Sequence, residues 1–269
     1  MIKAGVIGHP IAHSKSPLIH GYWLKKFGID GEYMAYDVPP DNLVAGVNRL
    51  VQAGLRGFNV TLPHKQTIMD LCSDISEDAQ KIGAVNTVVI DDHGQLHGRN
   101  TDAFGFIQNL DETIPDFDWS NRETVVIGAG GAARAVLYAL SIKGVQDITL
   151  TNRTQESANF LASGYGAKVT AWDQRQKAIQ GSDLIINTTS LGMKGQPPLE
   201  IDLSGITDQA VVYDIVYAPL YTPLLCAARD QGAQFVTGIG MLLHQARPAF
   251  AAWFSQYPEV TPELEKLVL

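Results

Sequence analysis

The sequence predicts an α/β protein built from parallel β-sheets that are covered by helices. Short β-rich runs alternate with helical stretches along almost all of its 269 residues, which is typical of β-α-β units. In addition, the apolar run TVVI leads directly into the glycine-rich stretch GAGG and then into a helical pattern, as in a doubly wound nucleotide-binding sheet. The length suits two domains of about 100 to 150 residues each.

The first part of the chain alternates strands and helices and then turns back in a hairpin. AVNTVVID and QLHGRN are typical hairpin strands joined around 92–94, and the second strand leads to Asp102 at the start of a helix. The block 111–123, rich in Pro, Asp and Asn, indicates a loop, so we expect a domain boundary within 103–122. The preceding strands and helices are expected, in chain order, at 4–8, 16–27, 32–38, 41–53 and 57–61.

The second part of the chain begins with a glycine turn between a strand and a helix. Gly128 allows the tight turn, Gly130 lets a pyrophosphate approach the backbone, and Ala133 is the small residue where the helix meets the strand. Free N–H groups at the helix start would then bind the phosphates. A turn that only joins strand to helix is the simpler alternative. Further strands complete the sheet at 147–152, 183–189, 210–216 and 234–238.

The residues after the second of these strands indicate which dinucleotide is bound. A dinucleotide fold places the adenosine ribose there, about 20 residues beyond the glycines. The sequence has Asn-Arg-Thr at this point and no acidic residue that would accept from a ribose 2′-hydroxyl. The planar guanidinium of Arg153 suits a 2′-phosphate, so we predict NADP as the cofactor. A solvated arginine after a strand is the alternative interpretation.

A nicotinamide cofactor implies hydride transfer, which needs a hydroxyl or carbonyl substrate and a proton donor beside it. Polar side chains occur at several predicted strand ends and loops of the first part of the chain. Because ligands bind at the carboxyl ends of the strands in an open α/β sheet, we expect these side chains to converge on one cleft. They are Ser14, Ser16, Asn59, Thr61, Lys65, Asn86 and Asp102.

Composition excludes several other classes of function. A net charge of −8 gives no basic footprint for nucleic acid, although a small anion can still bind in a local positive pocket. No apolar run approaches the roughly 18 residues that span a bilayer, and the N-terminus lacks a signal-peptide pattern, so we expect no membrane association and a cytoplasmic location. Cys72 and Cys226 stand far apart without a CxxC partner, which argues against a metal site and a disulfide.

Nine stretches along the chain carry a resemblance to a known family: GHPIAHSKSPLIH, FNVTLPHK, IGAVNTVV, GRNTDAFGF, GAGGAAR, NRT, NTTSLGM, YDIVYAPLYTPLL and GIGMLLHQA. Together they make the chain similar to the shikimate dehydrogenase family from end to end. The resemblance implies NADPH-dependent reduction of 3-dehydroshikimate to shikimate in chorismate and aromatic amino-acid biosynthesis, by a monomer or homodimer. It also implies a substrate-binding domain at 1–103 plus 240–269, because the C-terminal helix returns to that domain, and a Rossmann NADP-binding domain at 104–239.

The resemblance also implies roles for individual residues. Lys65 and Asp102 would be the catalytic pair, with Lys65 protonating the developing alkoxide, and Ser14 and Ser16 would bind the substrate carboxylate. The remaining substrate groups would be Asn59, Thr61, Asn86, Tyr217 and Gln245. Cofactor groups would be Gly128, Ala129, Gly130, Gly131 and Ala132 at the pyrophosphate, Asn152, Arg153 and Thr154 at the adenosine phosphate, and Thr188, Ile215, Gly238 and Met241 at the nicotinamide.

Alternatives remain at both levels. Ser14 and Ser16 are also good helix caps, as is Asp102, and Gln245 is also typical of a helix surface. A quinate/shikimate dehydrogenase that uses NAD or NADP is the nearest alternative enzyme. A non-catalytic dinucleotide-sensing protein is the alternative of another class, because a fold alone does not establish turnover.

Overall fold

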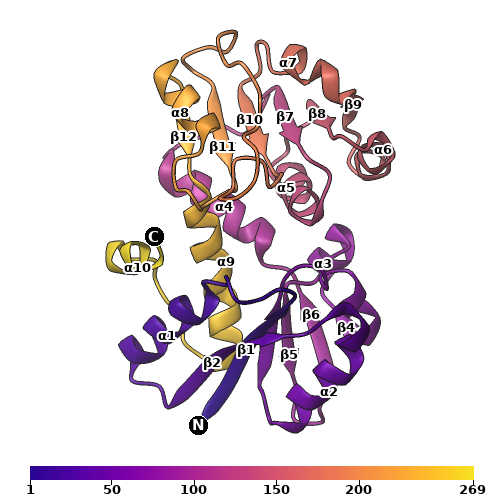
Figure 1. Cartoon of the computed structure of the whole chain (residues 1–269), viewed down its shortest axis with the longest axis vertical. Helices are drawn as coiled ribbons and strands as arrows, with labels where there is room; N and C mark the ends of the chain where they lie inside the picture. The colour runs from indigo at the N-terminus through magenta and orange to yellow at the C-terminus, as the bar shows by residue number, and fades with distance from the viewer. The chain divides into compact units, whose positions relative to one another are not determined.

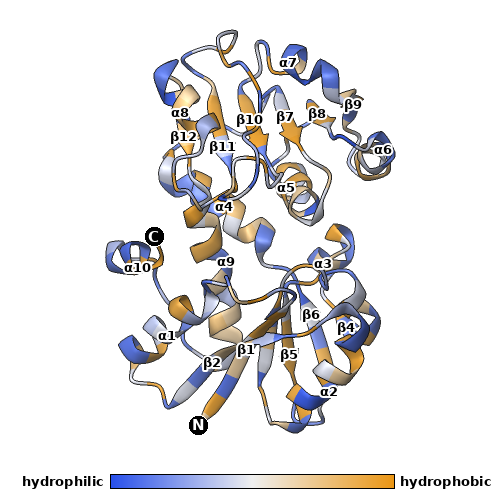
Figure 2. Ribbon diagram, in the orientation of Figure 1, coloured by the Kyte–Doolittle hydropathy of each residue, from blue (hydrophilic) through white to orange (hydrophobic).

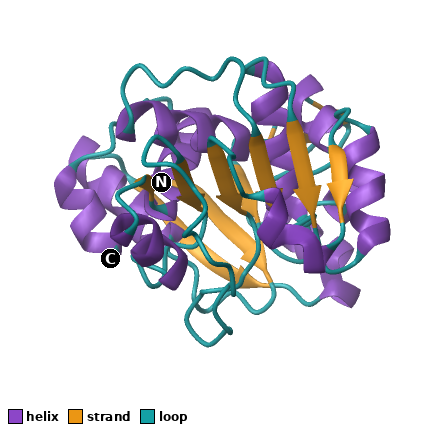
Figure 3. Ribbon diagram, turned by 90° about the horizontal axis from the view of Figure 1, so that it is seen from above, coloured by secondary structure: helices purple, strands orange, loops and turns teal.

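The computed structural model describes all 269 residues and divides into two compact units. Unit 1 comprises Met1–Asp102 and Leu243–Leu269, and unit 2 comprises Ala103–Leu242. Each unit has one six-stranded sheet (Figure 1), and helices accompany the strands (Figure 3). This architecture confirms the predicted α/β class. No helix combines the length and the apolar character needed to cross a membrane.

The sheet of unit 1 is mixed, with the strand order β2-β1-β3-β5-β6-β4. Strand β1 runs parallel to β2 and β3, whereas β5 is antiparallel to both β3 and β6. The predicted hairpin is therefore present, and it breaks the expected all-parallel pattern because a short turn reverses the chain. The strands are β1 (Ile2–Gly8), β2 (Gly31–Asp37), β3 (Gly57–Val60), β4 (Asp74–Ile75), β5 (Thr87–Ile90) and β6 (Leu96–Arg99).

The helices of unit 1 bury one apolar face against this sheet. In α2, Leu43, Val47 and Leu50 recur at helical spacing and pack with Phe58 of β3 and other buried residues in one core cluster. The helix α1 ends at Gly28 in the left-handed conformation that favours glycine. The helical elements are α1 (Ser16–Phe27), η1 (Pro40–Asn42), α2 (Leu43–Gln52), η2 (Thr67–Leu71), α3 (Glu77–Ile82), α9 (Gly238–Phe254) and α10 (Pro262–Val268). The part of α9 that belongs to unit 1 begins at Leu243.

The C-terminal segment is packed into the sheet of unit 1. The indole Nε1 of Trp253 donates to the carbonyl oxygen of Val88, at 3.0 Å. Gly57 lies against both groups with a φ of 156°, and a Cβ there would lie 2.1 Å from each of them. Only glycine fits at this position, so β3, β5 and α9 approach one another more closely than side chains would allow.

The sheet of unit 2 is all parallel, with the order β12-β11-β10-β7-β8-β9. The strand order reverses between β7 and β10, which is the switch point where doubly wound sheets bind ligands. Strands β7, β10 and β11 are buried along their whole length, and β10 is mostly apolar (Figure 2), as both faces are covered. The strands are β7 (Thr124–Ile127), β8 (Ile148–Thr151), β9 (Lys168–Thr170), β10 (Leu184–Asn187), β11 (Val211–Asp214) and β12 (Gln234–Val236).

The helices expected after Asp102 and after the glycine turn are both present in unit 2, and the first of them is longer than expected. Residues 111–113, expected in a loop, continue α4, because Leu110 is fully buried and Asp111 accepts a hydrogen bond from the indole of Trp119. The loop therefore begins after Thr113. The helical elements are α4 (Asp102–Thr113), α5 (Gly131–Ile142), α6 (Gln155–Ser163), η3 (Trp172–Gln174), α7 (Arg175–Ala178) and α8 (Pro223–Asp230).

Candidate active site

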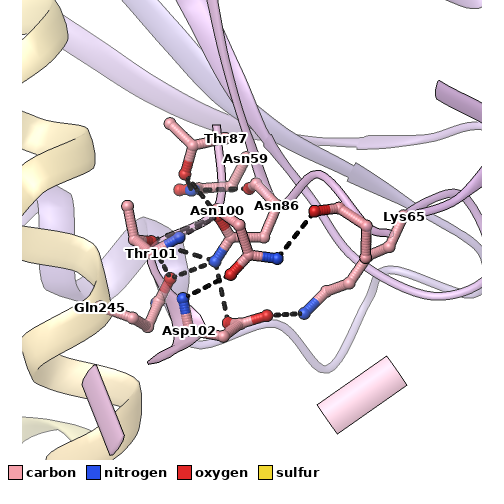
Figure 4. Close-up of polar contacts among 9 residues, drawn as sticks. Asn59, Lys65, Asn86, Thr87, Asn100, Thr101, Asp102 and Gln245 are labelled. Carbon is pink, nitrogen blue, oxygen red and sulfur yellow. Dashed lines mark hydrogen bonds and ion pairs between the residues drawn. The ribbon is translucent and has the colours of Figure 1, made fainter. Parts of the chain in front are cut away.

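Lys65 is held in place by its neighbours in unit 1. It follows β3 in a tight turn, and its own carbonyl oxygen accepts from the N–H of Val85 at 2.7 Å. The preceding His64 is buried, with its Nε2 2.6 Å from the carbonyl oxygen of Val38. The Lys65 side chain is 19% exposed, and its Nζ donates to Asp102 Oδ2 at 2.6 Å (Figure 4). Lys65 is therefore no ordinary surface lysine.

Both carboxylate oxygens of Asp102 accept hydrogen bonds from side chains. Its Oδ2 binds Lys65, and its Oδ1 accepts from Asn86 Nδ2 at 2.8 Å. The backbone N–H of Asp102, at the start of α4, instead donates to Asn100 Oδ1 at 2.9 Å. Because both carboxylate oxygens are directed at side chains, helix capping does not account for Asp102.

Asn86 lies at the centre of this polar cluster, immediately before β5. Its Oδ1 accepts from the backbone N–H of Thr101 and from the hydroxyl of Thr87, each at 2.9 Å. Its Nδ2 donates to Thr101 Oγ1 at 3.0 Å as well as to Asp102. On α9, Gln245 directs its Oε1 to within 3.4 Å of the same Nδ2 (Figure 4). Gln245 is thus half-buried and directed at the cluster, which a helix-surface residue would not be.

Asn59 joins the cluster from β3. Its Nδ2 donates to the carbonyl oxygen of Asn86 and to Thr87 Oγ1, each at 3.1 Å, and its Oδ1 accepts from the Tyr33 hydroxyl at 2.7 Å. A carbonyl oxygen can only accept, so the orientation of the Asn59 amide is fixed. Sequence reasoning missed Tyr33, Thr87, Asn100 and Thr101. Only the polar run GRNTD before a predicted helix hints at two of them.

The two serines lie at the start of α1, and Ser16 reaches that network through Tyr33. Lys15 is the N-cap residue and makes no side-chain cap, whereas Ser14 Oγ accepts from the backbone N–H of Ser16 at 3.3 Å. Local capping thus occupies Ser14 in part. Ser16 is buried beside Tyr33. Burial raises the pKa of the Tyr33 phenol, and a hydrogen bond with the Ser16 hydroxyl opposes this shift. Thr61 follows β3 in the same unit and is half-buried.

In unit 2, the glycine turn has the form that a phosphate site requires. Gly128 follows β7 with a φ of 111°, and a Cβ there would lie 2.6 Å from Thr188 Oγ1. Gly130 is the N-cap of α5 and has no side-chain cap, and a Cβ at Gly130 or Gly131 would meet nothing within 4 Å. Ala133 is fully buried where α5 meets the sheet. The first N–H groups of α5 are therefore open to an anion, together with Ala129 and Ala132 beside them.

The segment after β8 presents a basic side chain at the start of α6. Arg153 is exposed, and Asn152 folds the turn by donating to the carbonyl oxygen of Thr154 at 2.9 Å. Thr154 is the N-cap of α6, but its side chain makes no cap hydrogen bond. The guanidinium and the hydroxyl are thus both accessible at a helix N-terminus, a combination suited to a phosphate.

Of the remaining predicted residues of unit 2, Thr188 follows β10, Ile215 and Tyr217 follow β11, and Gly238 and Met241 lie in the first turns of α9. Thr188 donates to the carbonyl oxygen of Ile127 at 2.8 Å. Gly238 packs so tightly on Ile215 that a Cβ would lie 2.2 Å from the Ile215 oxygen. Met241 is buried on α9. Tyr217 is half-buried in the same unit, and burial raises the pKa of its phenol.

The chain is similar to known proteins over its full length. A family model described as the shikimate dehydrogenase substrate binding domain matches residues 6–88, and one described as shikimate / quinate 5-dehydrogenase matches residues 110–193. Shikimate dehydrogenase (NADP(+)) of Azorhizobium caulinodans is 47% identical, covering 100% of this chain and 96% of that protein. The protein of the same name from Methylobacterium radiotolerans is 50% identical, covering 99% and 96%.

Two solved structures illustrate the similarity in fold. Shikimate 5-dehydrogenase from Thermus thermophilus, in complex with NADP(H) and shikimate, matches with a TM-score of 0.88 at 34% identity, covering 100% of this chain and 98% of that one. Quinate dehydrogenase from Corynebacterium glutamicum, in complex with NAD, matches with a TM-score of 0.91 at 32% identity, covering 99% and 98%.

Proposed function

The chain belongs to the shikimate dehydrogenase family, and from that premise we propose that it reduces 3-dehydroshikimate to shikimate with NADPH, reversibly, in chorismate and aromatic amino-acid biosynthesis. The ion pair between Lys65 and Asp102 is the observation that supports catalysis by this chain, beyond its membership of the family. The ammonium and the carboxylate are sheltered and lie 2.6 Å apart, which is the kind of orientation that a proton donor needs.

The residues of unit 2 fit NADP as the cofactor. The open N-terminus of α5 and its glycines would bind the pyrophosphate, and Asn152, Arg153 and Thr154 the adenosine phosphate. Thr188, Ile215, Gly238 and Met241 would line the nicotinamide end. Gly128 supports this assignment because its backbone conformation and its contact with Thr188 exclude any side chain. When bound, the nicotinamide exchanges a hydride with the substrate.

Lys65 would supply the proton that accompanies this transfer. Its ammonium would donate to the oxygen that develops negative charge at C3 of the substrate, and would recover the proton in the reverse reaction. Asp102 Oδ2 accepts a hydrogen bond from Lys65 and so directs its Nζ, while Asn86 restrains the other carboxylate oxygen at 2.8 Å. Asp102 thereby shares in positioning the proton.

The substrate would be held by hydroxyl and amide groups. We assign its carboxylate to Ser14 and Ser16, and its ring hydroxyls to Asn59, Thr61, Asn86, Asp102, Tyr217 and Gln245. The clustering of Asn59, Asn86, Asp102 and Gln245 around Lys65 supports this assignment, because the reacting hydroxyl has to reach the lysine.

The cellular setting follows from the same function. We propose a cytoplasmic enzyme, a monomer or a homodimer, whose partners are its two small-molecule ligands. Cys72 and Cys226 are both free thiols, which fits a reducing compartment. Sedimentation analysis at several protein concentrations would distinguish the two oligomeric states.

A second candidate function is that of a quinate/shikimate dehydrogenase, because the chain is also similar to a quinate dehydrogenase with NAD bound. Arg153 argues against it, since NAD has no 2′-phosphate to pair with a guanidinium. Initial rates of NADP and NAD reduction, each with shikimate and with quinate, separate the two. Turnover of shikimate with NADP supports the proposal, preferred turnover of quinate with NAD supports the second candidate, and no turnover in any combination would favour a dinucleotide-sensing protein.

A further inference from the structure

The carboxylate of Asp214 is fully buried at the carboxyl end of β11. Its Oδ1 accepts from Asn187 Nδ2 and from the backbone N–H of Val216, each at 3.0 Å, and its Oδ2 accepts from Thr222 Oγ1 at 2.6 Å. Burial raises the pKa of this carboxyl to about 6, and the three donors, all uncharged, oppose the shift. Neighbouring Tyr213 directs its phenol elsewhere, to Asn109.

The three donors belong to three different segments. Asn187 ends β10, Val216 lies in the segment after β11, and Thr222 begins α8, where it also caps the helix by accepting from the N–H of Leu225. Asn187 extends the network, since its Oδ1 accepts from both the N–H and the hydroxyl of Thr189. One carboxylate therefore joins the ends of two neighbouring strands to the start of a helix.

Stability alone is a poor explanation for this arrangement. Burying a carboxylate without a cationic partner is costly even when it is hydrogen-bonded, and a well-packed apolar residue is often at least as stabilising. The network lies at the carboxyl ends of parallel strands, the edge where such sheets bind ligands. Its members are interleaved with three proposed ligand contacts, Thr188, Ile215 and Tyr217.

We propose that Asp214 is a positioning residue, which holds the segment 215–222 against the end of β10 so that Ile215 and Tyr217 are oriented for cofactor and substrate. Asp214 does not contact either ligand and acts through Val216 and Thr222. This inference rests on the proposed function, because the ligand roles of Ile215 and Tyr217 come from it.

Matched variants at Thr222 isolate the central hydrogen bond. Thr222→Val keeps the shape of the side chain and removes the hydroxyl, whereas Thr222→Ser keeps the hydroxyl. Asp214→Asn keeps an oxygen that accepts from Asn187 and Val216, but its amide nitrogen can only donate, so the Thr222 hydroxyl loses its acceptor. Asp208→Asn, at an exposed aspartate of the same unit, is the control for the chemical change itself.

The expected result is a rise in KM for shikimate of about five- to tenfold in Thr222→Val and Asp214→Asn, with kcat nearly unchanged. Thr222→Ser and Asp208→Asn keep the wild-type KM. In the ligand-free protein, amide hydrogen exchange of 215–222 is faster in the first two variants only. As the pH falls from 7.5 through 6, KM rises in the wild type and stays flat in Asp214→Asn, because only the wild type loses an acceptor.

Two results would overturn the inference. One is a lower melting temperature in Thr222→Val and Asp214→Asn with unchanged KM, which would make the network purely structural. The other is a KM in Thr222→Ser that rises as much as in Thr222→Val. A wild-type protein that is inactive with shikimate would instead overturn the proposed function, and this inference with it.

Discussion

Replacing Lys65 by methionine removes the ammonium and leaves an unbranched, flexible side chain in its place. The Nζ lies 2.6 Å from Asp102 Oδ2, and the two side chains are only 19% and 11% exposed, so water has little access to take over the role of the ammonium. If Lys65 supplies the proton, kcat falls by about 10²- to 10⁴-fold, the usual range for general acid–base catalysis. That loss corresponds to about 3 to 5 kcal/mol in the activation barrier.

The assay measures kcat and KM for shikimate and NADP in the oxidative direction, and for 3-dehydroshikimate and NADPH in the reductive direction. Thermal unfolding is followed by circular dichroism. Lys81→Met is the matched control, since Lys81 pairs with Glu77 at 2.7 Å but its side chain is 56% exposed. The control is expected to keep the wild-type kcat. Both variants are expected to remain folded, because neither lysine side chain is part of an apolar core cluster.

A double variant tests whether the pair acts as a unit. If Lys65 and Asp102 act together, Lys65→Met/Asp102→Asn loses no more kcat than Lys65→Met alone, because the second change removes a partner that no longer has a function. A folded Lys65→Met with a kcat close to the wild-type value would refute the reasoning. So would a Lys81→Met variant that loses as much.

The other predictions concern the ligands and the pH dependence of stability. Ser16→Ala is expected to raise KM for shikimate about 10- to 100-fold and leave KM for NADP unchanged; earlier melting with unaltered KM would favour the helix-cap interpretation. Arg153→Asp is expected to weaken NADP at least about tenfold and NAD much less, and an equal loss for both would make Arg153 structural. The pKa of Asp214 is about 6 in the folded protein against an ordinary value of 3.8, so the folded state holds the proton more tightly than the unfolded state. The resulting contribution to stability is fully present below pH 3.8. This contribution is lost as the pH rises through 6, so between pH 4 and pH 7 the free energy of unfolding falls by roughly 2 to 3 kcal/mol relative to Asp214→Asn. Denaturant unfolding at pH 4 and pH 7 measures this difference.

Much of the fold follows from local pattern. The helix at 16–27 and the strands of both sheets with alternating or continuous apolar residues are confirmed at or near their expected bounds. The elements that were not predicted include the helices α6 and α8 and the strand β4 (Asp74–Ile75), which forms a strand only because it pairs with His97 and Gly98 of β6. Such a strand depends on a partner distant in sequence, and two residues carry no periodicity of their own.

The candidate site could be predicted only in part, for a similar reason. Lys65, Asn86 and Asp102 stand out as polar residues at strand ends, where ligands bind. Tyr33 lies within β2 and has the appearance of a core aromatic, and Asp214 ends a buried strand. Their roles depend on which groups the fold brings to their hydroxyl and carboxylate oxygens, and no local pattern specifies those neighbours.

The contact of Trp253 with Val88 and Gly57 has a consequence for biosynthesis. The strands of unit 1 leave the ribosome first, yet the indole that closes on β3 and β5 emerges only after the whole of unit 2 has been made. Unit 2 is continuous in sequence and can complete its sheet during translation. The core of unit 1 stays incomplete until Leu243–Leu269 has been made. Gln245 is delivered by the same late segment, so the cluster around Lys65 is completed among the last events of synthesis.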